Sequence, residues 1–290
     1  MTLTTATRTS ALEIVPLSPA IGAEVRGVDL AKPLDAATFA AIEQAWLDHV
    51  ILLFRGQTID QDQQLAFAGL FGPLGARSRP VERRPEGAEM NPAVMLISNI
   101  RKNGVPIGSL PDGEMWFHHD MSYVEAPYRG TFLYAIELPS TGGNTRFANM
   151  YKAYDNLPSK TKERIRGLKA MHLYDYGTSE KLKREADLSK VAHRAQPIAI
   201  THPLTGRKAL YVNRLITGWI EGLEPAESDA LLEELFQHAE DPAVYYEHVW
   251  RKDDLMMWDN WCSIHARTDF PASERRLLRR CTILGQPLHE

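Results

Sequence analysis

The sequence predicts one domain of the α+β class over residues 1–290, with a core built mainly from strands and with helices at its flanks and in its insertions. Three observations predict this class. Residues 35–50 carry apolar side chains at helical spacing, residues 50–54 form a short run that is apolar throughout, and neither repeats nor a linker divide the chain. The 44% of apolar residues are enough to fill a substantial core.

The first half of the chain shows how these elements are recognised. Apolar residues recur every three or four positions over residues 35–49, which predicts an amphipathic helix that begins near Asp35. A buried strand over 50–54 follows, and Asp60 or Asp62 is placed to cap a second helix. The same patterns predict strands over 95–100, 132–138, 244–250, 255–258 and 277–284, and helices over 225–238 and over 151–167, the latter broken at Pro158.

Three segments do not fit regular structure. Residues 1–15 have no basic start followed by an apolar core of roughly 7 to 15 residues, so we expect a flexible terminus and not a signal peptide. Residues 75–92 are broken by proline and glycine, and residues 175–197 include a charge-rich stretch. Both are expected to be active-site loops. For the charged stretch two interpretations stay open, a solvated face and a mobile cover of the site.

Charge and cysteine content exclude several classes of protein. The net charge of −4 offers no basic surface for nucleic acid or for a membrane. Two cysteines, Cys262 and Cys281, are too few for a secreted disulfide scaffold and fit a reducing compartment. No apolar run approaches the roughly 20 residues that span a bilayer. We therefore expect a cytoplasmic protein that binds neither nucleic acid nor membrane.

The segment Trp116-Phe-His-His-Asp120 carries the first two candidate metal ligands. In an extended chain, residues i and i+2 share a face, so His118 and Asp120 can converge on one ion while His119 points away. A His-x-Asp pair alone is weak evidence, because it is more often only a hydrogen-bonded pair. His265 supplies a third ligand, and two histidines with one carboxylate form the facial triad suited to non-haem iron(II) oxygenases.

Two arginines follow His265 at a spacing that suits anion binding. Arg276 and Arg280 lie four residues apart in a strand-like stretch, so they share one face, whereas Arg279 faces the other way. A guanidinium binds a carboxylate through two parallel hydrogen bonds. The coordination positions that the triad leaves open can take the keto acid end of the cosubstrate 2-oxoglutarate, and Arg276 is the candidate for its far carboxylate. A second inward arginine needs an anion of its own. The alternative is that such arginines are exposed on a surface strand and bind no ligand.

Several motifs resemble, in order and spacing, the taurine dioxygenase and 2,4-dichlorophenoxyacetate dioxygenase family of iron(II)/2-oxoglutarate enzymes. The resemblance covers nearly the whole chain. It depends on Val50-Ile-Leu-Leu-Phe-Arg-Gly-Gln57, Phe71-Gly-Pro-Leu74, His118-His-Asp120, Leu138-Pro-Ser-Thr-Gly-Gly-Asn-Thr145, Met257-Trp-Asp-Asn260, His265, and Arg276 through Arg280 to Thr282.

The resemblance implies a fold and a set of cofactor contacts. The implied fold is a double-stranded β-helix, a distorted jelly roll of cupin type, with the ligands at the mouth of the barrel. His118, Asp120 and His265 are implied as catalytic iron(II) ligands. Thr145 and Arg276 are implied to hold the distal carboxylate of 2-oxoglutarate, the cosubstrate that is used together with O2.

The substrate contacts follow less directly. Arg280 matches an arginine that binds the substrate anion, and Arg77 lies near a position where relatives place a substrate contact. Asn99 and Tyr123 are candidate pocket residues, with strand-end and core positions as the alternatives. An aromatic pocket would favour an aryloxyalkanoate-like acid, and its candidate residues are Trp116, Phe117, Tyr123 and Tyr174.

The expected reaction is hydroxylation of a small carboxylate or sulfonate, with release of succinate and CO2. Halogenating relatives lack the ligand carboxylate, which is present here as Asp120. Hydroxylation beside an ether oxygen, amine or sulfonate would lead to C–O, C–N or C–S cleavage. The alternatives are a taurine-like alkylsulfonate dioxygenase, a cupin-like metalloenzyme without 2-oxoglutarate, and an inactive jelly-roll binding protein. By resemblance, a homodimer or tetramer is expected.

Overall fold

Strands from both ends of the chain pair into one seven-stranded sheet in the computed structural model, which describes residues 12–77, 91–110, 113–175, 182, 184 and 187–290. The strands are β1 (Glu13–Pro16), β2 (Ala23–Arg26), β3 (Ile51–Phe54), β4 (Met95–Ser98), β8 (Gly130–Glu137), β16 (Leu255–Asp259) and β18 (Leu277–Ile283). Their order is β1-β2-β3-β16-β8-β18-β4, and only the β2–β3 pair is parallel. The first and last parts of the chain therefore fold together.

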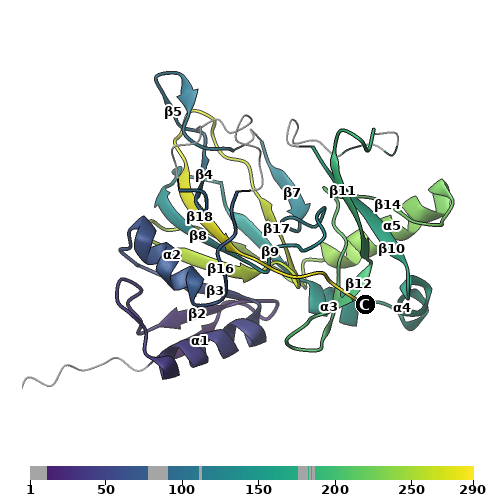
Figure 1. Cartoon of the computed structure of the whole chain (residues 1–290), viewed down its shortest axis with the longest axis horizontal. Coiled ribbons are helices and arrows are strands. Elements are labelled where there is room, and N and C mark those ends of the chain that lie inside the picture. Colours follow the sequence, from purple (N-terminus) through teal and green to yellow (C-terminus); the bar gives the residue numbers. More distant parts are fainter. Residues whose placement is uncertain (1–11, 78–90, 111–112, 176–181, 183, 185–186) are drawn as a thin grey trace, which may run out of the picture.

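A second, four-stranded antiparallel sheet lies beside the first (Figure 1). It contains β7 (Met115–His118), β9 (Thr145–Asn149), β15 (Tyr245–His248) and β17 (Ser263–Arg267), in the order β15-β9-β17-β7. Phe147 and Ile264 of this sheet share one core cluster with Leu133 and Met256 of the larger sheet. The main core thus lies between the two sheets.

Two helices cover the other face of the seven-stranded sheet (Figure 1). Helix α1 (Ala36–His49) begins after Asp35, whose carboxylate accepts hydrogen bonds from the first turn. Helix α2 (Gln61–Gly69) begins with a capping box between Asp60 and Gln63, so Asp60 and not Asp62 is the cap. Both predicted helices are confirmed.

Strand β3 shows why its sequence is apolar without alternation. Leu52 and Phe54 pack in the cluster that holds the helices, whereas Ile51 and Leu53 pack in the cluster between the sheets. All four side chains are fully buried. A strand covered on both faces needs apolar residues at every position.

The middle of the chain forms smaller units. The helix predicted over 151–167 is confirmed as two helices that break at Pro158. The predicted helix 225–238 is confirmed as α5. The bounds are α3 (Met150–Asp155), α4 (Ser159–Ile165), α5 (Pro225–Ala239), β5 (Arg101–Lys102), β6 (Val105–Pro106), β10 (Lys169–Tyr174), β11 (Ala192–Pro197), β12 (Ala199–Thr201), β13 (Lys208–Leu210) and β14 (Thr217–Ile220).

The architecture confirms a sheet-rich α+β class. In the described part of the chain the pairings make five separate sheets and no closed barrel. None of the helices in this part combines the length and the apolarity that crossing a membrane requires.

Three predicted segments fall partly outside the described residues. Of the terminus predicted as flexible, 1–11 are outside, and from Glu13 the chain is paired as β1. Of the two predicted active-site loops, 78–90 are outside in the first, and 176–181, 183 and 185–186 in the second. The structure therefore does not choose between the two interpretations of the charged stretch.

Candidate active site

His118 and Asp120 stand at the end of β7, but only His118 belongs to the strand. Asp120 lies in the turn that follows, where Met121 adopts a positive φ of 60°. The expectation that both share one strand face is therefore wrong, although the turn still brings the two side chains together. His119 points away from them, as predicted, and its Nδ1 lies 3.2 Å from Nδ2 of Asn213.

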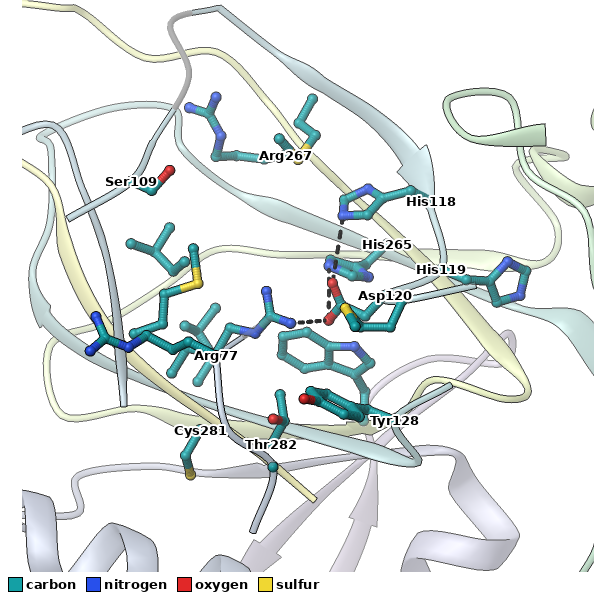
Figure 2. A pocket seen from close by; sticks show the side chains of 18 of the residues that line it. Arg77, Ser109, His118, His119, Asp120, Tyr128, His265, Arg267, Cys281 and Thr282 are labelled. Carbon is teal, nitrogen blue, oxygen red and sulfur yellow. Dashed lines mark ion pairs between the residues drawn. The ribbon is translucent and has the colours of Figure 1, made fainter. Parts of the chain in front are cut away.

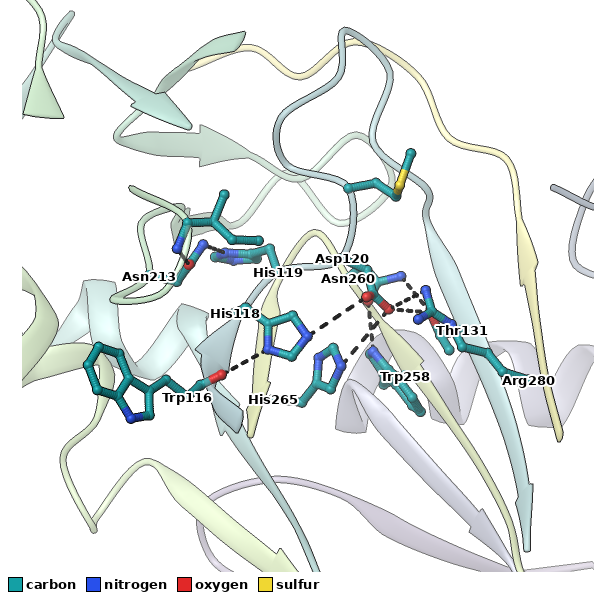
Figure 3. A network of polar contacts seen from close by, with 12 residues as sticks. Trp116, His118, His119, Asp120, Thr131, Asn213, Trp258, Asn260, His265 and Arg280 are labelled. Carbon is teal, nitrogen blue, oxygen red and sulfur yellow. Dashed lines mark hydrogen bonds and ion pairs between the residues drawn. The ribbon is translucent and has the colours of Figure 1, made fainter. Parts of the chain in front are cut away.

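His265 lies in β17, directly opposite His118 of β7 in the antiparallel ladder. This pairing places the two imidazole ring centroids 4.2 Å apart. One carboxylate oxygen of Asp120 is 4.0 Å from Nε2 of His118, and the other is 4.0 Å from Nε2 of His265. The three side chains each offer a ligand atom, and these atoms lie within 4.8 Å of one another (Figure 3).

The protonation of this cluster suits a divalent cation. Burial lowers the pKa of His118, and it lowers the pKa of His265 to about 3. Burial alone would raise the pKa of Asp120, but the charges of Arg280, His265 and His118 and the hydrogen bond from Thr131 outweigh it, and the pKa falls to about 2. Near neutral pH the cluster therefore offers two neutral imidazoles and one carboxylate.

The backbone fixes the tautomer of His118. Its Nδ1 is 2.9 Å from the carbonyl oxygen of Trp116, which can only accept, so Nδ1 carries the proton. The lone pair is then on Nε2, the atom that faces Asp120. This arrangement, with one ring nitrogen bound to the protein and the other free to ligate, is usual for histidine metal ligands.

The cluster borders a cavity of about 210 Å³ (Figure 2). Its walls are mostly apolar, with a few charged groups, as in many small-molecule sites. Of the candidate ligand and pocket residues from the sequence, those that line it are Arg77, His118, Asp120, Tyr123, Thr145, Tyr174, His265, Arg276 and Arg280. Trp116 and Phe117, expected in an aromatic pocket, are not among the lining residues of the described chain.

Arg276 is the most unusual of these side chains, because its guanidinium is buried without a full set of partners. It is 1% exposed, and its Nη2 donates to the carbonyl of Gly143 at 3.2 Å. Nε and Nη1 have no hydrogen-bond acceptor among the described residues. Burial lowers the pKa of Arg276 to about 9, and nearby Arg267 adds to this. A buried cation of this kind calls for an anionic ligand.

The surroundings of Arg276 explain the Gly142-Gly143 turn. Gly143 has a φ of +64°, and a Cβ there would meet Nε of Arg276 at 3.1 Å. Thr145 lines the same cavity, and its hydroxyl accepts a hydrogen bond from the indole of Trp250 at 3.0 Å. The hydroxyl proton of Thr145 therefore remains available for a further acceptor.

Asn99 differs from its predicted position. It is not among the cavity-lining residues of the described chain. Its side-chain oxygen accepts from the backbone N–H of Arg276 at 2.9 Å, and its Nδ2 donates to the carbonyl of Glu274 at 2.8 Å. The expectation that Asn99 contacts the substrate is therefore wrong. Its side chain instead forms hydrogen bonds with the backbone of Glu274 and Arg276 and so helps to position Arg276.

Arg280, Arg77 and Tyr123 line the same cavity, and the sequence did not reveal their partners. Nη2 of Arg280 is 2.9 Å from Oδ2 of Asp120. Tyr123 stacks on Tyr174, with ring centroids 4.7 Å apart and an interplanar angle of 11°. The stacked pair is an apolar wall in the same cavity as Arg280.

Sequence reasoning missed Arg267 and Thr131. Arg267 lines the cavity and donates to the carbonyl of Gly113. It lies two residues after His265 on β17, so alternation along that strand would have found it, had the strand been predicted. Thr131 donates to Asp120 from β8, and no sequence signal joins residues eleven positions apart on different elements.

Comparison with known proteins identifies the family. Residues 13–282 match the model of the taurine catabolism dioxygenase TauD, TfdA family. The chain is 33% identical to the (S)-phenoxypropionate/alpha-ketoglutarate-dioxygenase of Sphingobium herbicidovorans, over 97% of both chains. It is 35% identical to the alpha-ketoglutarate-dependent 2,4-dichlorophenoxyacetate dioxygenase of Cupriavidus pinatubonensis, over 93% of this chain and 96% of that one.

A solved structure gives the same result in three dimensions. AAD-2, in complex with Mn(II) and N-oxalylglycine, has a TM-score of 0.79 and 30% identity, over 97% of this chain and all of that one. The chain therefore belongs to the TauD/TfdA family. It is an oxidoreductase, an alpha-ketoglutarate-dependent dioxygenase, and alpha-ketoglutarate is 2-oxoglutarate.

Proposed function

We propose that the chain is an iron(II)- and 2-oxoglutarate-dependent dioxygenase that hydroxylates a small organic acid, most closely an aryloxyalkanoate. In the balanced reaction one O2 and one 2-oxoglutarate convert a substrate C–H bond to C–OH, with release of succinate and CO2. The observation that carries the proposal is one cavity that holds both a His-Asp-His cluster and a buried arginine, two of whose nitrogens have no acceptor among the described residues.

The metal would be held by Nε2 of His118, Nε2 of His265 and one carboxylate oxygen of Asp120. Two imidazoles and one carboxylate are the donor set of non-haem iron(II) oxygenases, and they leave coordination positions for a chelating ligand and O2. When bound, iron(II) supplies the activation of O2 at the expense of 2-oxoglutarate. The protein supplies the orientation of the ligands and the apolar walls that exclude water.

The cosubstrate would be held at its far carboxylate by Arg276 and Thr145. The guanidinium of Arg276, whose Nε and Nη1 have no acceptor among the described residues, can form two parallel hydrogen bonds with that carboxylate through the adjacent N–H groups of Nη1 and Nη2. The hydroxyl of Thr145 can donate a third. N-oxalylglycine, found with AAD-2, likewise carries a carbonyl next to one carboxylate and has a second carboxylate. A cupin-like enzyme without 2-oxoglutarate would leave this buried arginine without a function.

The substrate anion would be held by Arg280 with Arg77, and its organic part by the Tyr123–Tyr174 wall. The relatives named for phenoxypropionate and 2,4-dichlorophenoxyacetate support an aryloxy acid. An aromatic ring beside the stacked tyrosines would be held by apolar contact and ring stacking. Hydroxylation at the carbon that bears the ether oxygen would release a phenol. Taurine-like sulfonates remain the second candidate, since a guanidinium binds a sulfonate as well.

The remaining expectations are part of the same proposal. The two main sheets would be the two halves of a double-stranded β-helix in a single domain, with residues 75–92 and 175–197 covering the site. Arg77 and Tyr174, at the described edges of these segments, both line the cavity and support this view. Assembly as a dimer or tetramer in the cytoplasm stays a prediction.

The proposal is tested by measuring succinate formation with aryloxy, amino and sulfonic acids in the presence of iron(II), O2 and 2-oxoglutarate. We expect succinate to rise with an aryloxyalkanoate and phenol to appear in equal amount. Absence of an optical change when 2-oxoglutarate is added to the anaerobic iron(II) protein, together with no succinate for any acid, would contradict the assignment.

The roles of the two arginines are separated by a variant. Arg280→Ala should raise the KM for the organic acid about tenfold or more and leave the KM for 2-oxoglutarate within about threefold. Arg275→Ala is the matched control, because Arg275 is exposed on the same segment and pairs with Glu137. The reverse pattern of KM values would exchange the assignments of Arg276 and Arg280.

A further inference from the structure

Three residues behind Asp120 form a chain of hydrogen bonds that ends on its carboxylate (Figure 3). Nε1 of Trp258 donates to Oδ1 of Asn260 at 2.7 Å, and Nδ2 of Asn260 donates to the hydroxyl of Thr131 at 3.0 Å. The hydroxyl of Thr131 in turn donates to Oδ2 of Asp120 at 2.9 Å. The Trp258-Asp-Asn260 motif is part of the family resemblance, but it contributes no ligand to the proposed metal site and no contact to the proposed anion sites.

The direction of each hydrogen bond in this chain is fixed by chemistry. An indole N–H can only donate, so the amide oxygen of Asn260 must face Trp258 and its NH2 group must face Thr131. The hydroxyl of Thr131 therefore accepts from Asn260, and its single proton is left for Asp120. This chain of hydrogen bonds therefore keeps the O–H group of Thr131 directed at the Asp120 carboxylate, whatever molecule occupies the cavity.

The chain is built on rigid and dry elements. Trp258 of β16 is the direct partner of Thr131 of β8 in the antiparallel ladder. The backbone N–H of Asn260 donates to the carbonyl of Arg129 at 2.7 Å. Thr131 and Asn260 are 0% exposed and Trp258 is 1% exposed. Hydrogen bonds in such an interior hold their geometry tightly, because water cannot replace them.

The two oxygens of Asp120 are consequently unequal. Oδ2 accepts from Thr131 and also lies 2.9 Å from Nη2 of Arg280, which together use both of its lone pairs. Each oxygen lies 4.0 Å from Nε2 of one histidine, Oδ1 from His118 and Oδ2 from His265, but no described residue donates to Oδ1. We infer that Thr131 and Asn260 are positioning residues that hold Oδ2 and so present Oδ1 as the metal ligand. This inference rests on the proposed metal site.

Thr131 and Arg280 both bind Oδ2 of Asp120, but only Arg280 also lines the cavity. Arg280 is a long, charged side chain on the cavity wall, and a substrate anion would compete with Asp120 for its N–H groups. Thr131 is fully buried and has no contact with the cavity. The threonine therefore keeps Asp120 oriented when Arg280 turns to the substrate. Outer partners of metal ligands contribute in this way roughly 10- to 100-fold in metal affinity.

The test is the dissociation constant for Mn(II), measured from the electron paramagnetic resonance signal of the free ion. Thr131→Val keeps the shape and removes the hydroxyl, and it should raise the dissociation constant about tenfold or more. Thr131→Ser restores the hydroxyl and should stay within about threefold of the wild type. Asn260→Leu removes the donor one step back, without touching Asp120, and should weaken binding in the same direction.

A matched control separates positioning from stability. Thr161 also donates its hydroxyl to a carboxylate, that of Glu234 at 2.6 Å, but on helices α4 and α5, which contribute no residue to the cavity lining in the described chain. Thr161→Val should lower the melting temperature of the metal-free protein and leave the Mn(II) dissociation constant unchanged.

The possible results distinguish the inference from the proposed function. Wild-type protein that binds no Mn(II) would overturn the proposed metal site itself. Wild-type binding that Thr131→Val and Asn260→Leu leave unchanged would overturn the positioning role and leave the metal site standing. If circular dichroism shows that Thr131→Val is unfolded, the Mn(II) dissociation constant of Asn260→Leu alone tests the positioning role.

Discussion

Two clusters in the described part of the chain hold residues that could bind a metal, and only one of them is arranged to do so. His118, Asp120 and His265 border the cavity, whereas His202, Asp259 and Cys262 are fully buried. Within each set the ligand atoms lie within 4.8 Å of one another. Residue type and distance therefore do not separate a candidate metal site from a packed polar cluster.

The difference lies in what the backbone offers to Nδ1 of each histidine, which is a carbonyl oxygen at His118 and N–H groups at His202. Nδ1 of His202 accepts from the backbone N–H groups of Leu204 at 3.3 Å and Thr205 at 3.2 Å, so its proton is on Nε2. That proton is donated to Asp259 at 3.1 Å, and no lone pair remains for an ion. Burial also raises the pKa of the Cys262 thiol well above its usual range. His118 has the opposite tautomer, with its Nε2 lone pair toward Asp120.

Each cluster also has a buried arginine, and these differ in the same way. Arg129 lies 3.9 Å from Asp259, and its guanidinium is 4.5 Å from the centre of a Trp46 ring. Both guanidinium groups have two nitrogens without an acceptor among the described residues, but Arg276, unlike Arg129, has no carboxylate there within 4.0 Å. The buried cluster is neutralised from within. The cluster at the cavity keeps the Nε2 lone pair of His118 free for a metal ion, and Arg276 in the same cavity offers a positive charge to an anionic ligand.

The largest effect is expected from Asp120→Ala. The variant lacks the anionic ligand, so Mn(II) binding and succinate formation should both be lost, the latter by about a thousandfold or more. The metal-free protein should remain folded, because Asp120 lies in a turn at the cavity and not in a core cluster. Turnover above about a tenth of the wild-type rate would show that the cluster at the cavity is not the reacting centre.

A smaller effect is expected from Arg276→Met, with Arg129→Met as its control. Removing one partner of a buried charge pair costs about 2 to 5 kcal/mol, so the KM for 2-oxoglutarate should rise about 30-fold or more. The melting temperature of the protein without 2-oxoglutarate should not fall, because a buried cation without an anion is removed. Arg129→Met should lower the melting temperature and leave this KM unchanged. Equal effects of both variants on KM would remove the distinction between the two arginines.

Local patterns in the sequence were sufficient for the faces of strands and the ends of helices. Asp35 caps α1, and Pro158 separates α3 from α4, because capping and proline geometry depend only on neighbours in the chain. Period-two alternation placed Arg276 and Arg280 on the cavity wall, and Arg279 on the other face, where it bonds to Gln64.

Contacts between distant segments were beyond such patterns. Strand β17 was missed although it carries His265, since Ser263–Arg267 has few apolar residues and gains its order from β7 and β9. Asn99 was expected in the cavity, but its partner is the backbone of Arg276, 177 positions away. Residue types and family resemblance together predicted the triad, and only the pairing of strands shows that His265 lies opposite His118.

The smallest effect is expected from Cys262→Ser in the buried cluster. The free energy of unfolding should fall by about 1 kcal/mol or less, since a hydroxyl replaces a thiol of similar size, and the melting temperature should fall by about 2 to 4 °C at most. Zn(II), which prefers thiolate and imidazole ligands, is the most sensitive probe of this cluster. Wild type and variant should each bind one Zn(II) per chain, and Asp120→Ala none. Two ions in the wild type and one in Cys262→Ser would mean that the tautomer of His202 does not keep metal out.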